Sequence, residues 1–419
     1  MTVVGGSMRQ SIIRRSFFVS AVFVAGHLFH YALMVTANRL LAPDPFGRLY
    51  AAISLLNVLY TPATVLTFLF AQHFTVVYTA AGRDALVGEL KRLFAKHAML
   101  GAGVALATAA LLLLSASATG ADAFILLMLV PCTALAVYLF EVARSAFQGM
   151  LAFFAYSAAW IAWRAGQYVL AVIGILLTGT AWSAMAGILL ATIIAIVVML
   201  GLIVRGSGTT APTADTAAWP PFRALPAIPF AIEYGIFVLM NNIDVLIAYL
   251  VLSNDELGIY AASSVLPKAI VTATHPVSQV MLPVMTASER TRAVGVTAVV
   301  KALIVTGVAG TAGAAALYFG RNAACNTWLG LRFCSTELLT TLAIAATPLG
   351  MLRVLVVASL AAGRSDMVLV AIPALIAVAA AIFIRGTSTA TLAEIYLVCC
   401  WGFLILYACA MLTLRRAAA

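Results

Sequence analysis

Long apolar runs recur along almost the whole chain, and they restrict the possible folds more than any other feature. They extend from Ser16 to Leu414, and many have about twenty residues, the length that a helix needs to cross a bilayer. Runs of about ten residues with alternating hydrophobicity, which are typical of an outer-membrane barrel, are missing. Because only helices and closed barrels satisfy all backbone hydrogen bonds in lipid, the sequence predicts an all-α polytopic membrane protein.

The composition agrees with this class. Of the 419 residues, 64% are hydrophobic and 9% are charged, whereas soluble domains contain about 25% charged residues. The segment 1–15 leads into an apolar run that is too long for a signal peptide and has no small-residue cleavage site after it, so we expect a retained first helix. The net charge is +10, but no run of basic residues is interleaved with aromatic residues, so no nucleic-acid partner is expected.

The hydropathy pattern predicts twelve transmembrane helices, and the basic residues predict their orientation. An even number of spans places both termini on one side of the membrane. Of the 24 Lys and Arg residues, 16 fall on that side, 5 on the other side and 3 within spans. Because basic loops remain in the cytoplasm, we expect cytoplasmic termini. The predicted spans are 16–42, 47–80, 98–118, 122–148, 151–177, 181–204, 226–252, 257–286, 296–319, 336–362, 366–385 and 391–414.

A short sequence repeat divides the chain into halves. The segment LAPDPFGRLYAA at 41–52 aligns with LSNDELGIYAAS at 252–263, so that Gly47 matches Gly258 at an offset of 211 residues. Between the halves, residues 205–225 are rich in Gly, Thr, Ala and Pro and have no apolar period, which is typical of a linker. We therefore predict a six-helix lobe over 1–204, a cytoplasmic linker over 205–225 and a second six-helix lobe over 226–419.

A second cytoplasmic segment, residues 83–97, has the pattern of an amphipathic helix. Leu86, Leu90, Leu93 and Phe94 fall on one helical face, and charged residues cover the rest. We expect this helix to lie on the inner leaflet; a solvated connecting loop is the alternative.

Charged residues inside the predicted spans are the candidate functional residues. In the hairpin 241–268, Asp244 and Lys268 lie about 13–18 Å from the polar turn at 1.5 Å per residue, near the membrane midplane, where a charge costs about 2.5–3.5 kcal/mol. The intramembrane cations are Arg164, Lys268 and Arg353. They could attract phosphate groups of a substrate, or they could neutralise the intramembrane acids Glu141, Glu233 and Asp244.

Two further patterns concern the interior. His30 and His27 lie one helical turn apart. No cysteine or carboxylate accompanies them at ligand spacing, so we expect no metal site, and polar lining of the cleft is favoured over a proton relay. Asp244 beside Asn241 could bind a coupling cation, either Na⁺ or a proton, and Glu233 is a second candidate for coupling. A structural pair of Asp244 with Lys268 is the alternative.

The longest predicted external loop contains two cysteines, Cys325 and Cys334. If that side of the membrane is a periplasm, a disulfide between them is allowed. Two free thiols are the alternative.

The hairpin residues resemble a known family. The segment 37–47, ANRLLAPDPFG, resembles the opening of bacterial polysaccharide flippases. Asn242-Ile243-Asp244, the segment 256–262 (ELGIYAA) and Pro283 resemble their seventh and eighth helices. These flippases form the O-antigen and exopolysaccharide branch of the multidrug/oligosaccharidyl-lipid/polysaccharide (MOP) exporter superfamily. One residue departs from the motif, because Pro45 stands where the family has an acid.

The resemblance implies a fold and a function. It implies two six-helix lobes around a central cationic cleft that opens alternately to each side of a bacterial inner membrane. It also implies a lipid-linked oligosaccharide on a polyprenyl diphosphate as cargo, with polysaccharide-assembly enzymes as partners. The other helices match the family only in hydropathy and number.

The sequence also limits the energy source and the rival functions. No nucleotide-binding or hydrolase motif is present, so we expect no enzyme activity and no cofactor beyond a coupling ion. A drug/cation antiporter of the same superfamily would have a more acidic, aromatic cavity. A membrane-embedded glycosyltransferase or polymerase would need an acidic motif in a sizeable loop, and no predicted loop exceeds roughly twenty residues.

Overall fold

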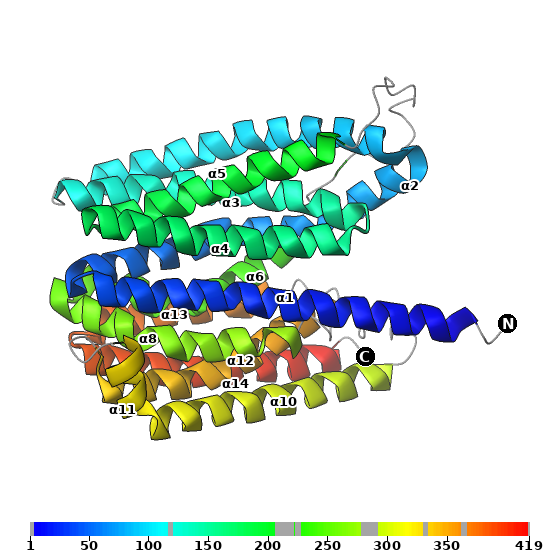
Figure 1. The fold of residues 1–419 in the computed structure, drawn as a ribbon. Helices are drawn as coiled ribbons and strands as arrows, with labels where there is room; N and C mark the ends of the chain where they lie inside the picture. Colours follow the sequence, from blue (N-terminus) through cyan, green and yellow to red (C-terminus); the bar gives the residue numbers. More distant parts are fainter. Residues whose placement is uncertain are drawn as a thin grey trace. The chain divides into compact units, whose positions relative to one another are not determined.

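The fold is shown by a computed structural model, which describes residues 4–115, 120–205, 222, 228–277, 292–329, 334–361 and 367–417. Every regular element within these residues is a helix (Figure 1), which confirms the predicted all-α class. The elements are α1 (Val4–Leu40), α2 (Pro43–Ser115), α3 (Ala121–Gly149), α4 (Phe153–Thr178), α5 (Ala181–Arg205), α6 (Ile228–Met240), α7 (Ile243–Val251), α8 (Asn254–Ala273), α10 (Arg292–Phe319), α11 (Arg321–Ala323), the π-helix η3 (Ala324–Leu329), α12 (Thr336–Ala361), α13 (Val368–Arg385) and α14 (Thr389–Ala417).

The helices cover most of the predicted spans. Among the described residues, ten helices are long and apolar enough to cross a membrane, and the bent pair α6–α7 makes one further span. The long helix α2 contains two predicted spans, because it breaks at Gly82, where φ is 77° and ψ is −166°. Only glycine adopts this backbone conformation readily. The chain is therefore a multi-pass membrane protein.

Residues 83–97 are helical, as the amphipathic pattern predicts, but their apolar face is covered by protein and not by the lipid of the inner leaflet. They form the first turns of the second part of α2, which continues to Ser115. Leu86, Leu90 and Leu93 are almost completely buried within the protein. The sequence pattern could not separate these cases, because an apolar face can be covered by lipid or by neighbouring helices.

Contacts divide the chain into two compact units. The first consists of Met1–Leu33 and Pro62–Ala227, and the second of Met34–Thr61 and Ile228–Ala419. The segment 34–61, which contains the first copy of the repeat, thus belongs to the same unit as the second copy. The lobe boundaries at 205–225 stay a prediction, and residues 206–221 and 223–225 of the linker, like Pro283, lie outside the described residues.

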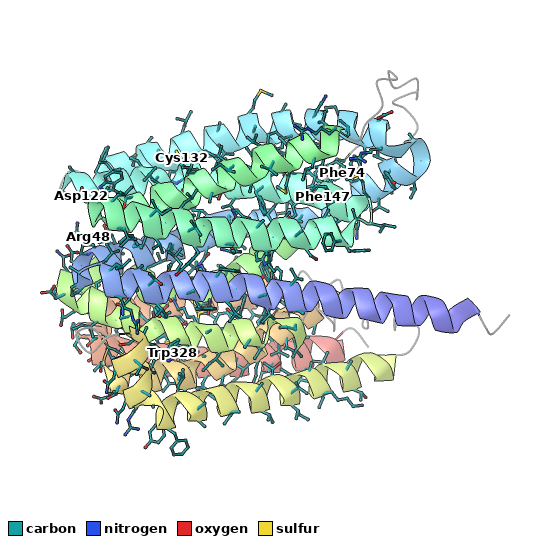
Figure 2. The ribbon with its side chains drawn as sticks, viewed as in Figure 1. Arg48, Phe74, Asp122, Cys132, Phe147 and Trp328 are labelled. Atoms are coloured by element: carbon teal, nitrogen blue, oxygen red, sulfur yellow. A yellow bond between two sulfur atoms is a disulfide. The ribbon has the colours of Figure 1, made fainter. Side chains whose placement is uncertain are left out.

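In the first unit, α5 packs against α3 and α4, and glycines set the closest approaches. A Cβ atom at Gly187 of α5 would lie 2.5 Å from the carbonyl oxygen of Leu170 in α4. At the end of α3, a Cβ atom at Gly149 would lie 2.5 Å from the Cβ atom of Phe74 in α2. Phe74 and Phe147 occupy this region in Figure 2 and are buried.

In the second unit, α12 is the central helix. It packs against α8, α10 and α14, and 78% of the residues in its most apolar stretch are buried. The two copies of the repeat meet in this unit. A Cβ atom at Gly258 would lie 2.4 Å from the Pro43 carbonyl oxygen, and one at Gly47 would lie 2.9 Å from the Gly258 nitrogen. The repeated glycines therefore allow the first turns of α2 and α8 to pack backbone against backbone.

Candidate functional site

The span formed by α6 and α7 is broken at two asparagines. The two helices bend by 53° at Asn241 and Asn242, whose side chains compete with the backbone for hydrogen bonds. The Asn242 amide donates to the Val238 carbonyl at 2.7 Å, and the Tyr396 hydroxyl donates to the Met240 carbonyl at 3.0 Å. The break is thus held by side chains from within the second unit.

Asp244 lies in the first turn of α7, directly after the break. It is fully buried, and its carboxylate accepts hydrogen bonds from the Lys268 ammonium at 3.1 Å and from the Tyr260 hydroxyl at 3.3 Å. The Lys268 nitrogen also lies 5.6 Å from the centre of the Tyr50 ring. For this pair of charges, the structural alternative is therefore present.

The space beside this ion pair is small. A cavity of about 10 Å³ is lined by Asp244, Ser264, Lys268 and Tyr396, with apolar residues around them. This volume is at the lower limit for one water molecule. In this conformation the cavity can therefore accommodate a small ion or water, but no sugar or drug molecule.

The other two ion-coupling candidates lie on the N-terminal side of the break. Asn241 ends α6, and its side-chain oxygen is buried without a hydrogen-bond partner among the described residues. Glu233, on α6, is 1% exposed and accepts a hydrogen bond from the Tyr407 hydroxyl of α14. Glu233 thus has a different partner from Asp244. No group of three or more His, Cys, Asp or Glu residues that could hold a metal ion occurs in the described part of the chain.

Arg353, on α12, has neutral partners. Its guanidinium donates to the Tyr234 hydroxyl at 3.0 Å and to the His275 Nε2 atom at 2.8 Å. It also lies 5.5 Å from the centre of the Phe237 ring. The side chain is 7% exposed, its Nε atom is buried without a hydrogen-bond partner, and no acid among the described residues forms an ion pair with it.

In the first unit, Arg164 lies among aromatic rings. On α4, its guanidinium carbon is 4.7 Å from the Trp160 ring and 4.4 Å from the Trp163 ring, and one N–H donates to the Gln167 oxygen at 3.0 Å. The histidines of α1 lie close to this group. The His27 ring is 5.7 Å from Trp160, and His30, one turn further along α1, is half-buried beside Tyr31.

The prediction missed a buried ion pair in this unit. Glu141 pairs with Arg144 at 2.6 Å, and both are almost completely buried. The Arg144 guanidinium also lies 4.3 Å from the Tyr156 ring and 4.9 Å from the Trp160 ring. The signal was present in the sequence, because oppositely charged residues three apart on a helix face each other. Arg144 was instead expected among the cytoplasmic charges.

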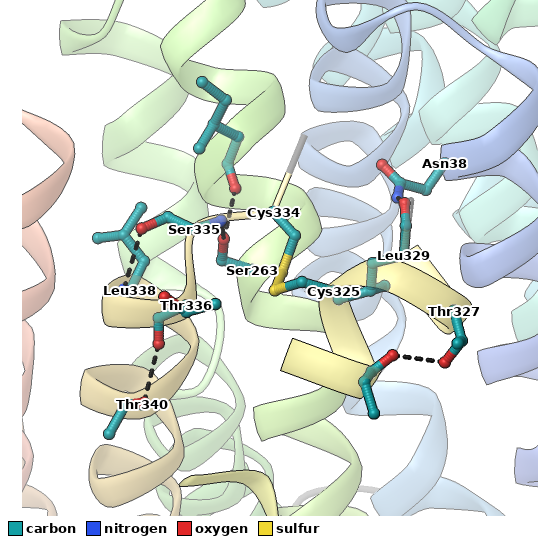
Figure 3. Close-up of a disulfide and its surroundings, with 12 residues drawn as sticks. Asn38, Ser263, Cys325, Thr327, Leu329, Cys334, Ser335, Thr336, Leu338 and Thr340 are labelled. Atoms are coloured by element: carbon teal, nitrogen blue, oxygen red, sulfur yellow. Dashed lines mark hydrogen bonds between the residues drawn. A yellow bond between two sulfur atoms is a disulfide. The ribbon is translucent and has the colours of Figure 1, made fainter. Parts of the chain in front are cut away.

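A disulfide joins Cys325 and Cys334 (Figure 3). Cys325 lies in η3, and residues near both cysteines are hydrogen-bonded to the second-unit part of α1 and to α8. From α1, Asn38 donates to the Leu329 carbonyl and Arg39 donates to the Trp328 carbonyl. From the other end, the Ser335 N–H donates to the Ser263 hydroxyl of α8 at 3.1 Å.

Comparison with known proteins identifies the fold. No protein-family model and no curated protein sequence matches this chain. An inward-facing multidrug-resistance MATE transporter of the MOP superfamily is 12% identical, with a TM-score of 0.73 over 94% of this chain and 96% of that chain. The chain is therefore a multi-pass membrane protein with the fold of MOP-superfamily transporters.

Two further structures share this fold. The lipid II flippase MurJ, in an inward closed conformation, is 11% identical, with a TM-score of 0.68 over 94% of this chain and 87% of that chain. A MOP-superfamily transporter from Pyrococcus furiosus is 12% identical, with a TM-score of 0.65 over 96% of this chain and 95% of that chain; its description states that the reverse polarity of its binding pocket suggests a different function. The superfamily prediction is thus confirmed at the level of the fold.

Proposed function

We propose that this protein moves an oligosaccharide linked to polyprenyl diphosphate from the inner to the outer leaflet of a bacterial inner membrane, with both termini in the cytoplasm. The hairpin motifs favour the polysaccharide branch of the superfamily, and the fold is shared with a lipid II flippase. The observation that carries the proposal is Arg353, a buried cation whose hydrogen-bond partners are neutral.

A diphosphate headgroup is suited to such a cation. A guanidinium offers five N–H donors in a planar fork that matches phosphate oxygens. Arg353 donates to Tyr234 and His275 and retains a buried Nε donor without a partner among the described residues. Because no acid among the described residues neutralises its charge, an incoming phosphate would gain the interaction without first displacing a described carboxylate.

The other predicted site residues receive subordinate roles. Arg164, on its tryptophan rings, and His30 stay candidate substrate contacts of the first unit. Lys268 is held by Asp244, so its contribution depends on the state of that carboxylate. Binding of a proton or Na⁺ at Asp244 would weaken its hold on Lys268 and leave the ammonium available to an anion. This links the substrate site to a coupling ion, for which Asn241 and Glu233 are further candidate ligands.

Reconstituted transport tests this proposal. Proteoliposomes would contain the wild-type protein or the variants Arg353→Gln, Arg353→Lys and Arg385→Gln, the last at the exposed end of α13. The readout is the fraction of a fluorescent polyprenyl-diphosphate sugar that a membrane-impermeant quencher reaches over time. We expect a loss of more than tenfold in Arg353→Gln, a smaller loss in Arg353→Lys and wild-type rates in Arg385→Gln. Equal rates in all four proteins would remove Arg353 from the site.

A drug/cation antiporter is the second candidate function. It is favoured by the fold shared with a multidrug-resistance MATE transporter and by the fully buried acid Asp244 beside a broken helix. Uptake of a fluorescent organic cation into the same proteoliposomes under a proton or Na⁺ gradient distinguishes the two. Cation uptake that Asp244→Asn abolishes, together with no movement of lipid-linked sugar, would replace the first proposal by the second.

A further inference from the structure

The second part of α2 carries an exposed basic face at its start, formed by Lys91, Arg92 and Lys96. All three residues are exposed, whereas Leu86, Leu90 and Leu93 on the other side of the same turns are buried in the first unit. The helix therefore presents its cations to the surroundings and its apolar side to the protein. This is the reverse of the orientation that membrane insertion of the segment would require.

The protein holds these turns firmly in place. Arg83, next to the break at Gly82, donates to the carbonyls of Leu202 and Ile203 at the end of α5, at 3.2 and 3.1 Å. Glu89 contacts the His73 ring at 2.8 Å. These contacts fix the helix start against two other segments of the first unit, so the basic face is a preformed surface.

One acid reduces the charge of this surface. Glu89 forms a two-pronged ion pair with Arg92, with distances of 2.7 and 2.9 Å. The Arg92 side chain nevertheless remains 64% exposed, because Glu89 itself is buried beneath it. Lys91 and Lys96 make no ion pair with any described acid, so the basic face retains two uncompensated charges.

Small residues lie between the cations. Gly88 and Ala95 are both exposed, and a Cβ atom at Gly88 would meet nothing within 4 Å. On a helix, positions 88, 91, 92, 95 and 96 share one side. The three cations therefore surround a shallow, open strip of backbone that a phosphate group can approach.

The same side of the helix becomes apolar one turn later. Met99 and Leu106, seven residues apart and on this side, are 72% and 71% exposed, as expected for side chains in contact with lipid tails. At 1.5 Å per residue, Lys96 lies about 5 Å and Lys91 about 12 Å from Met99 along the axis. The headgroup layer on each side of a bilayer is about 5–8 Å thick, and a lysine side chain extends about 6 Å further. All three cations can thus reach the phosphate level.

We propose that the basic face binds the headgroup of an anionic phospholipid, with an acyl chain along Met99 and Leu106. The occupant follows from charge complementarity and from the order of the two surfaces, because a phosphate followed by a hydrocarbon chain matches cations followed by exposed apolar side chains. The site does not depend on the transported substrate. It lies on the outer side of one helix of the first unit and shares no residue with the Arg353 or Asp244 sites.

Lipid titration of the purified full-length protein tests the proposal. Native mass spectrometry would count bound lipids when phosphatidylglycerol or phosphatidylcholine is added to the detergent-solubilised protein. Each basic residue near a lipid surface contributes about fivefold to affinity. We therefore expect the double variant Lys91→Gln/Lys96→Gln to bind the tightest phosphatidylglycerol about 25-fold more weakly, and the wild type to bind no phosphatidylcholine at this site.

A control separates the basic face from general charge. Lys301→Gln removes another exposed lysine, in the third turn of α10, and should leave the tightest binding unchanged. Raising the salt concentration to 1 M, which shortens the screening length to about 3 Å, should weaken binding to the wild type and have little effect in the double variant. Unchanged phosphatidylglycerol binding in the double variant, or an equal loss in Lys301→Gln, would overturn the proposal.

Discussion

Removal of the Asp244 carboxylate should destabilise the second unit strongly. In Asp244→Ala, the Lys268 ammonium loses its ionic partner at 3.1 Å while remaining 12% exposed at the side chain. The Tyr50 ring, 5.6 Å away, is then the remaining described interaction of this charge. Removing one member of a buried ion pair costs about 3–5 kcal/mol, because the other charge stays buried without compensation.

The double variant Asp244→Ala/Lys268→Met should be more stable than Asp244→Ala alone. It removes both charges, and a methionine of similar length can fill the space beside Pro267 and Leu349. Replacing a buried pair by apolar residues is often neutral or stabilising. We therefore expect most of the 3–5 kcal/mol to return, which is the opposite of what two independent losses would give.

The free energy of unfolding in mixed micelles, measured by titration with sodium dodecyl sulfate and followed by circular dichroism, gives these differences. Lys301→Met is the control, because it removes an exposed lysine and should change the free energy by less than about 0.5 kcal/mol. If Asp244→Ala is as stable as the wild type, or if the double variant loses the sum of the two single losses, the ion pair does not stabilise the unit as described.

Three further experiments test the helix packing, the break in α2 and the disulfide. Gly258→Ala places a methyl group 2.4 Å from the Pro43 carbonyl oxygen and should lower the unfolding temperature. Its control is Gly402→Ala, where a Cβ atom meets nothing within 4 Å, and this variant should be neutral or slightly stabilising. Equal stability of the two variants would contradict the backbone contact. Gly82→Ala forces a side chain into a conformation with φ of 77° and should cost about 1–3 kcal/mol in unfolding free energy, whereas Gly88→Ala should not; no difference between them would argue against the break in α2. Reduction with dithiothreitol should lower the unfolding temperature of the wild type, because the disulfide typically contributes about 2–4 kcal/mol, and should have no effect on Cys325→Ser; an insensitive wild type would show that the cysteines are not bonded.

The spans were predictable because hydropathy alone determines which segments enter a bilayer. The partnership of Asp244 with Lys268 was also foreseeable, as one of two alternatives, because both residues belong to one hairpin and lie at similar depth. The partners of Arg353 could not be predicted, because Tyr234 and His275 come from other parts of the chain and carry no charge that would mark them in the sequence. Neutral partners become visible only when tertiary packing is known.

The break in α2 illustrates a different limit. A glycine near the end of an apolar run indicates a possible turn, but the sequence does not show whether the following apolar face meets lipid or protein. For residues 83–97, burial of Leu86 and Leu90 within the first unit decided the question. Because the leucines face the protein, Lys91 and Lys96 on the other side of the helix are exposed. The lipid site at the basic face could therefore be inferred only from the structure.

Equilibrium binding of two ligands of opposite charge tests the central claim most directly. The purified protein would be titrated, by microscale thermophoresis, with a short-chain polyprenyl-diphosphate sugar and with an organic cation, in wild-type and Arg353→Gln forms. We expect the anionic lipid to bind the wild type and to lose more than tenfold in affinity in the variant, because the buried guanidinium supplies the charge that the diphosphate needs. Tighter binding of the cation than of the diphosphate, or equal diphosphate affinity in both proteins, would contradict the account.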